Sequence, residues 1–245
     1  MMTELLADVR TVVWKEWAEF VRQRSTVIGM LFFVVVFGVF IPVQRGREWL
    51  SSGVPFLNAA IFPATLALGV VADSFAGERE RHTLETLLAS RLPDHAILLG
   101  KFVAIVGYVW GLTVASLLAA AVAVNGAEPT GGPAFYPARL LVSGLVFGAL
   151  SAGLAAGAGI LVSLRAATVR QAAQVLTIGL MGLIFVGVAA ASALPDGWKR
   201  WLIETVRGLG PTATVLLAGA ALLFVDGVLL AVAALRFRRT RLLLD

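Results

Sequence analysis

The chain has no cysteine, few histidines and few charged residues, and each shortage excludes a class of protein. Its 245 residues include no Cys and only two His, and 14% of them are charged. Without cysteine there is no disulfide framework, thiol nucleophile or cysteine metal site. Soluble domains usually carry about 25% charged residues, so the low charge argues against a soluble fold.

Motifs for catalysis and nucleotide binding are also lacking. The pair Gly100-Lys101 is followed by Phe102, and His95 stands where a phosphate-binding loop has its first glycine. His82 and His95 do not have the spacing of metal ligands on one helical face, so both are expected at the surface. We therefore predict that the chain binds no metal and no cofactor directly. No Ser-His-Asp triad or carboxylate pair lies within the apolar segments, so no motif favours an enzyme.

Long apolar runs take the place of these features. The hydrophobic fraction is 59% and the mean hydropathy is +0.89. An apolar helix crosses the membrane core with about 20 residues, and lipid leaves helices as the only choice for such segments. We predict an all-α membrane protein, a single domain over 1–245, with six transmembrane helices at 26–43, 54–72, 102–124, 140–164, 172–194 and 211–235.

The distribution of basic residues predicts the orientation. Six spans place both termini on one side, and that side holds fourteen of the 20 Lys and Arg residues, whereas the opposite side holds six. Basic residues collect on the cytoplasmic side. Both termini and the loop 73–101 are therefore expected in the cytoplasm. The net charge of +5 thus reflects orientation in a lipid bilayer, and no nucleic-acid partner is expected.

Two segments outside the spans show helical periodicity. Apolar residues recur through 1–25 and predict an amphipathic helix along the inner membrane surface, with Trp14 and Trp17 at headgroup depth. This helix is either a simple anchor or a lever that also touches a cytoplasmic partner. Residues 195–210 contain Trp198 and Trp201 and predict a short helix at the outer interface, acting as a staple or as a gate.

Polar residues inside spans are costly and are therefore candidates for function. Asp226 lies in the inner half of the last span. We expect it to be paired with Arg165, Arg170 or Gln174, or else to serve a substrate or proton pathway. Asn58 marks a bent second span and is the other candidate pathway residue.

Small residues crowd the fourth span, and Gly159 is one of them. Gly144 and Gly148, and then Gly153 and Gly157, are spaced four residues apart. Such pairs let two helix backbones approach closely. We expect them to serve packing within the bundle rather than a dimer contact.

The loop 73–101 holds the densest run of charge in the chain. It reads DSFAGERERHTLETLLASRLPDHAILLGK and lies between two predicted spans. Its leucines at 84, 87, 88 and 92 recur at helical spacing and predict an apolar stripe. Glu78, Arg81 and Glu85 are expected to face a partner. A polar helix between two spans lies in water, and binding a water-soluble partner is the function expected of it.

This loop resembles the cytoplasmic loop of ABC-2-type (type V exporter class) transporter permeases. Residues 77–88 read GERERHTLETLL, and Pro93 and the closing Gly100-Lys101 follow. Members of this family share a pattern like G-E-R-E-x-G-T-L-E-x-L-L between their second and third spans. A proline and a terminal G-K follow it. His82 departs from it, since glycine is usual there. The rest of the chain agrees in architecture only.

The resemblance implies a permease subunit without enzyme activity of its own, in a bacterial or archaeal cytoplasmic (inner) membrane. The loop would be a coupling helix that docks on a separate ABC ATPase, which binds ATP and Mg. Two ATPase copies and a second permease copy or paralogue would complete an exporter of a small amphipathic, lipid-like, drug or ion substrate. The implied coupling residues are Glu78, Glu80, Arg81, Thr83, Leu84, Glu85, Leu87 and Leu88.

One alternative from another class stays open. A membrane scaffold or sensor, or an intramembrane enzyme, would use the same loop 73–101 to bind a different cytoplasmic partner. The sequence does not identify the substrate or the second permease chain.

Overall fold

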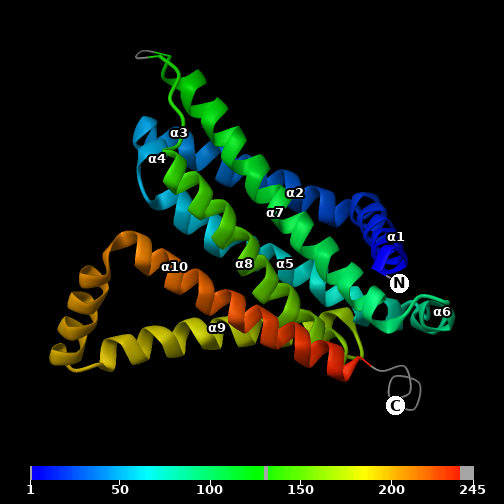
Figure 1. Cartoon of the computed structure of the whole chain (residues 1–245). Helices are drawn as coiled ribbons and strands as arrows, with labels where there is room; N and C mark the ends of the chain where they lie inside the picture. Colours follow the sequence, from blue (N-terminus) through cyan, green and yellow to red (C-terminus); the bar gives the residue numbers. More distant parts are fainter. Residues whose placement is uncertain (1, 130–131, 238–245) are drawn as a thin grey trace.

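The computed structural model describes residues 2–129 and 132–237, apart from the side chains of 2, 56, 57, 59–64, 66, 88 and 211. Within these ranges the secondary structure is helical throughout and contains no strand (Figure 1). The helices in chain order are α1 (Met2–Arg22), α2 (Arg24–Val35), a π-helical segment (Val36–Phe40), α3 (Ile41–Arg45), α4 (Arg47–Ser51), α5 (Val54–Glu80), α6 (Leu84–Ala89), α7 (Asp94–Ala127), α8 (Ala138–Ser163), α9 (Val169–Ala193) and α10 (Asp196–Arg236).

Five helices among the described residues are long and apolar enough to cross a membrane. They are Arg24–Arg45, Asp94–Ala127, Ala138–Ser163, Val169–Ala193 and Thr212–Arg236. Each coincides with a predicted span, which confirms an all-helical, multi-span architecture. The predicted second span, 54–72, falls inside α5, where many side chains lie outside the description, so that span stays a prediction.

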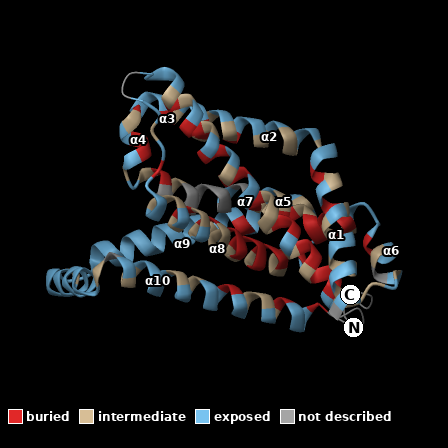
Figure 2. Cartoon of the chain, turned by 45° about the horizontal axis from the view of Figure 1, so that its top comes forward, coloured by how far each residue is buried: buried red, intermediate tan, exposed pale blue. Residues whose placement is uncertain are grey.

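Helices α5, α7 and α8 form the buried centre of the bundle (Figure 2). Glycines of α8 allow its close contacts with both neighbours. A Cβ atom at Gly159 would overlap Val71 of α5, and one at Gly157 would lie 3.0 Å from Cβ of Leu229 in α10. The prediction that the small residues of this span serve packing inside the bundle is confirmed at these two positions.

Most of α9 and α10 lies outside this centre. Their candidate spans are each only 6% buried within the chain (Figure 2). Gly210 adopts φ 74°, a left-handed conformation that breaks α10 into two helical parts. The first part, 196–209, occupies the segment where a short outer helix was predicted.

The charged loop begins as a continuation of α5 rather than as a separate segment. Helix α5 continues to Glu80, so the first charged residues extend that helix. The turn that ends it is a Schellman motif, in which Thr83 N–H donates to Glu78 O at 2.8 Å and His82 N–H donates to Arg79 O at 3.1 Å. His82 has φ 56°, which is the left-handed position that glycine normally fills. The short α6 and the start of α7 follow.

Candidate functional site

A buried ion cluster joins the charged loop to the N-terminal helix. Its members are Lys15, Glu16, Glu78 and Lys101, and Lys101 is 1% exposed. The Nζ atom of Lys101 donates to Glu16 Oε1 at 2.8 Å, to Glu78 Oε1 at 3.0 Å and to Ser74 O at 2.7 Å. An ammonium group has three protons and no acceptor, so each proton finds a partner here.

Lys15 completes the cluster and balances its charge. Its Nζ atom lies 2.6 Å from Glu78 Oε1, 3.3 Å from Glu16 Oε1 and 3.3 Å from Glu19 Oε1. Burial lowers the pKa of Lys15, but the carboxylates of Glu16 and Glu78 outweigh it and raise that pKa above its ordinary value. Two ammonium groups therefore face two buried carboxylates, which is the condition under which buried charge is tolerated.

Packing between α1 and α7 brings these charges together. Val12, Glu16 and Phe20 share one face of α1 at intervals of four residues, and all three are buried. A Cβ atom at Gly100 would lie 2.5 Å from Cβ of Val12, so glycine permits this approach. Trp17 Nε1 donates to Ala104 O at 3.2 Å. Part of the apolar face that was predicted to lie on the membrane therefore packs on α7.

The expectation that Glu78 faces a partner is wrong. Glu78 is 2% exposed, because the end of α5 lies against Lys15, in the second half of α1, and against Lys101, near the start of α7. Its Oε2 atom is buried without a hydrogen-bond partner among the described residues. Sequence reasoning missed Glu16 and Lys101 as members of this site. The available signal was an acidic residue inside the apolar stripe of α1 and a lysine at the apolar start of α7.

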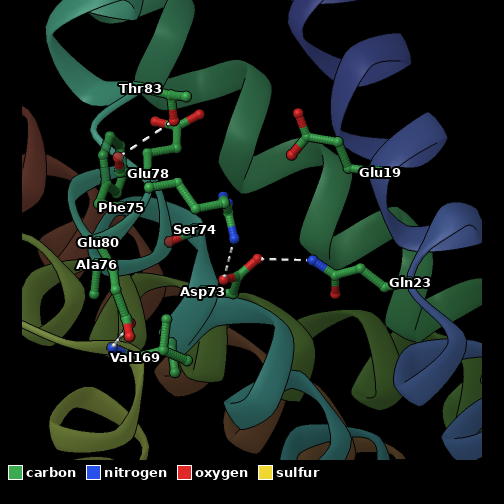
Figure 3. Close-up of polar contacts among 12 residues, drawn as sticks. Glu19, Gln23, Asp73, Ser74, Phe75, Ala76, Glu78, Glu80, Thr83 and Val169 are labelled. Carbon is green, nitrogen blue, oxygen red and sulfur yellow. Dashed lines mark hydrogen bonds and ion pairs between the residues drawn. The ribbon is translucent and has the colours of Figure 1, made fainter.

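Asp73 connects the loop to the junction of α1 and α2. Gln23, which separates these helices, donates from Nε2 to Asp73 Oδ2 at 3.1 Å (Figure 3). Arg81 donates from Nη1 to Asp73 Oδ1 at 2.9 Å. Burial lowers the pKa of Arg81, but this hydrogen bond and the charge of Asp73 raise it overall. Arg81 is therefore engaged within the chain while its side chain stays largely exposed.

Two neighbouring residues connect the end of α5 to the segment between α8 and α9. Glu80 Oε2 accepts a hydrogen bond from the N–H of Val169, at the start of α9, at 3.1 Å (Figure 3). Arg79 donates to Leu164 O at 2.9 Å and also to Ala166 O. Glu80 thus has an internal partner that its sequence context did not indicate.

Helix α6 has an inward apolar side and an outward polar side. Leu84 is buried in the cluster that contains Phe75, and Leu87 packs against that cluster. Glu85 and Thr86 are exposed. Thr83, which precedes α6, donates from Oγ1 to Glu78 O at 3.2 Å. The side chain of Leu88 lies outside the described residues.

The candidate pathway residues Asn58 and Asp226 are not brought together. Asn58 lines a cavity of about 10 Å³ with Phe33 and residues of α7, which is room for about one water molecule. Asp226 is 8% exposed and faces α8, where a Cβ atom at Gly153 would lie 2.7 Å from its Oδ2. Its Oδ1 has no hydrogen-bond partner in the described part of the chain.

The expected pairing of Asp226 is wrong for all three predicted partners. No hydrogen bond or ion pair joins it to Arg165, Arg170 or Gln174, which are all described residues. Arg165 instead lines a surface pocket with residues of α9 and α10. His82 and His95 are exposed, as predicted. Over 2–129 and 132–237, no group of three or more His, Cys, Asp or Glu side chains could hold a metal ion.

Comparison with known proteins identifies one family. Residues 7–205 match the family model described as ABC-2 type transporter. The match includes α1 from residue 7 onward, the whole charged loop and all four members of the ion cluster. A comparison with curated proteins finds no match.

Proposed function

Because the chain belongs to the ABC-2 type transporter family, we propose that it is the membrane permease subunit of an ATP-driven exporter. A separate ABC ATPase, present in two copies, binds ATP and Mg and hydrolyses the nucleotide. A second copy of this chain, or a paralogue, completes the pathway, since one bundle of helices encloses only part of it. The substrate is a small amphipathic, lipid-like, drug or ionic molecule.

The proposed topology has six spans, with 54–72 as the second. Fourteen of the 20 basic residues then lie on the side of the termini, which places both termini and α6 in the cytoplasm of a bacterial or archaeal cell. Helix α1 lies at the inner membrane surface with Trp14 exposed to the headgroups, and 196–209 lies at the outer surface with Trp198 exposed.

One observation carries the coupling proposal. Helix α6 has an exposed polar side, and the turn that precedes it connects it to the buried ion cluster. Glu85 faces outward, where an ATPase would dock. Leu84 and Leu87 face the core, so a force on α6 passes directly into packed side chains. Glu78, just before the turn, is bonded to Lys101 at the start of α7 and to Lys15 of α1.

The proposed coupling residues then divide by role. Glu85 and Arg81 contact the ATPase, and charged groups at such a surface set partner specificity. Leu84, Leu87 and Leu88 transmit force. Glu78 and Thr83 hold the turn, and Glu80 carries movement to α9 through Val169.

The test is purification of the chain from its native membrane with identification of the proteins that accompany it. A P-loop ATPase is expected in the eluate, and Glu85→Arg is expected to remove it. Glu48→Arg is the matched control, because Glu48 is also exposed but belongs to α4, far from α6 in the fold (Figure 1). Glu80→Ala is a second variant, expected to weaken the complex less than Glu85→Arg.

Two results would contradict the proposal. An ATPase that co-purifies at full stoichiometry with Glu85→Arg would show that α6 is not the docking element. A folded chain that brings no ATPase from its membrane would instead favour a scaffold, a sensor or a membrane enzyme.

A further inference from the structure

A groove lies between α8 and the last span, on the side of the bundle away from α6. Its cavity volume is about 740 Å³, within the range of about 300–1,000 Å³ usual for small-molecule sites. Its walls are almost entirely apolar side chains of α8 and α10, among them Val142, Val146, Leu150, Leu216 and Leu223. Figure 1 shows α8 and α10 close together near their inner ends and diverging toward their outer ends.

Asp226 lies one helical turn beyond the inner end of this groove. On α10 it follows the lining residue Leu223 by three positions, and on α8 its neighbour Gly153 follows the lining residue Leu150 by three. Residues three or four apart share a helix face, so both continue the faces that line the groove. Asp226 is 8% exposed as a residue, and its Oδ1 atom is buried with no partner among the described residues.

Among the described residues that line the groove, one is charged. Arg139 belongs to the first turn of α8 and is exposed. It is fourteen residues from Gly153, which is about 21 Å along a helix axis. The cation of Arg139 and the carboxylate of Asp226 therefore do not neutralise one another. A molecule that fills the groove meets apolar walls along its body and a single unpaired acidic group at the inner end.

We propose that the α8–α10 groove binds lipophilic cations, with Asp226 as the group that recognises the positive charge. This proposal rests on the transporter function above and names its substrate class. An isolated carboxylate in an apolar site is costly, and a bound cation removes that cost. An apolar body fits the walls, and a permanent positive charge fits Asp226. A lipophilic anion of the same shape has no favourable partner at the inner end.

The test is equilibrium binding of tetraphenylphosphonium to the purified full chain in lipid nanodiscs. Tetraphenylborate, of similar size but opposite charge, is the comparison ligand. We expect saturable binding of the cation, weakened about tenfold to a hundredfold by Asp226→Asn, which is the range for losing one charged contact. Asp196→Asn is the matched control, because Asp196 is an exposed acidic residue of the same helix.

A second variant keeps Asp226 and fills the groove. Ala220→Trp adds a large side chain to the lining and is expected to abolish cation binding while the chain stays folded, as judged by its elution volume. Equal binding of the cation by Asp226→Asn, or equal binding of the anion by the natural chain, would overturn the proposal. Absence of cation binding would also overturn it, and ATPase co-purification in the same preparations would show that the transporter function stands independently.

Discussion

Replacing Lys101 with methionine tests whether the ion cluster holds α1, α5 and α7 together. The change removes the ammonium group that lies within 3.0 Å of Glu16 Oε1 and Glu78 Oε1. Both carboxylates are buried, and afterwards Lys15 is the cluster's only cation. Breaking a buried ion pair by removing one partner costs about 3–5 kcal/mol. Because Lys15 still contacts both carboxylates, we expect the lower limit, about 3 kcal/mol.

The absence of cysteine supplies a simple assay. A single Cys introduced at buried Ala104 reacts with a maleimide dye only when the chain unfolds, so its labelling reports thermal unfolding in detergent. A loss of 1 kcal/mol lowers the unfolding temperature by about 2–4 °C in a chain of this size. Lys101→Met is therefore expected to lower it by about 6–12 °C.

Two further variants separate the cluster from general damage. Glu19→Gln removes a pair whose side chains are each 39% exposed, and exposed pairs are worth at most about 1 kcal/mol. The double variant Glu16→Leu with Lys101→Met leaves Glu78 and Lys15 as a balanced pair, so most of the lost stability is expected to return. A shift below about 2 °C for Lys101→Met, or a double variant no better than the single, would refute the reasoning.

Three other predictions follow from single positions. His82→Gly is expected to stabilise the chain by about 0.5–1 kcal/mol, because His82 adopts φ 56°; a lower unfolding temperature would contradict this. Gly159→Ala is expected to destabilise by about 1–3 kcal/mol, because its Cβ would overlap Val71, whereas Gly179→Ala meets open space and is expected to be harmless; equal unfolding temperatures would contradict the packing. Burial raises the pKa of Tyr136 to about 12 from 10.0, so the stability that the neutral phenol contributes is complete below pH 10 and is lost as the pH rises toward 12. Tyr136→Phe is expected to remove that loss, and unfolding temperatures of both chains at about pH 9 and pH 11 measure it.

The sequence predicts the helical architecture well because lipid imposes strong rules on the backbone. Five of the six predicted spans coincide with described helices. The glycines of the fourth span were also interpreted correctly, since Gly157 and Gly159 face neighbouring helices. These features depend on length, composition and spacing along one helix, which a single sequence contains in full.

The candidate site was predicted less well, because its contacts join distant parts of the chain. Lys101 and Glu16 are 85 positions apart, and each alone resembles an ordinary charge near a membrane surface. Asp226 was expected to have a charged or polar partner, yet its neighbour is the backbone of Gly153. Spacing along a helix predicts which residues share a face, but it does not predict which face of another helix lies opposite.

The contacts of the loop explain how a small movement of α6 can reach several spans at once. Asp73 is bonded to Gln23, at the junction of α1 and α2. Glu78 is bonded to Lys101, at the start of α7. Glu80 is bonded to the first residue of α9. All three acidic residues belong to the last turns of α5, so these turns cannot shift without moving the ends of three other spans or breaking these polar contacts, of which the pair between Glu78 and Lys101 is buried. Because breaking that buried ion pair is costly, we expect the spans to move together.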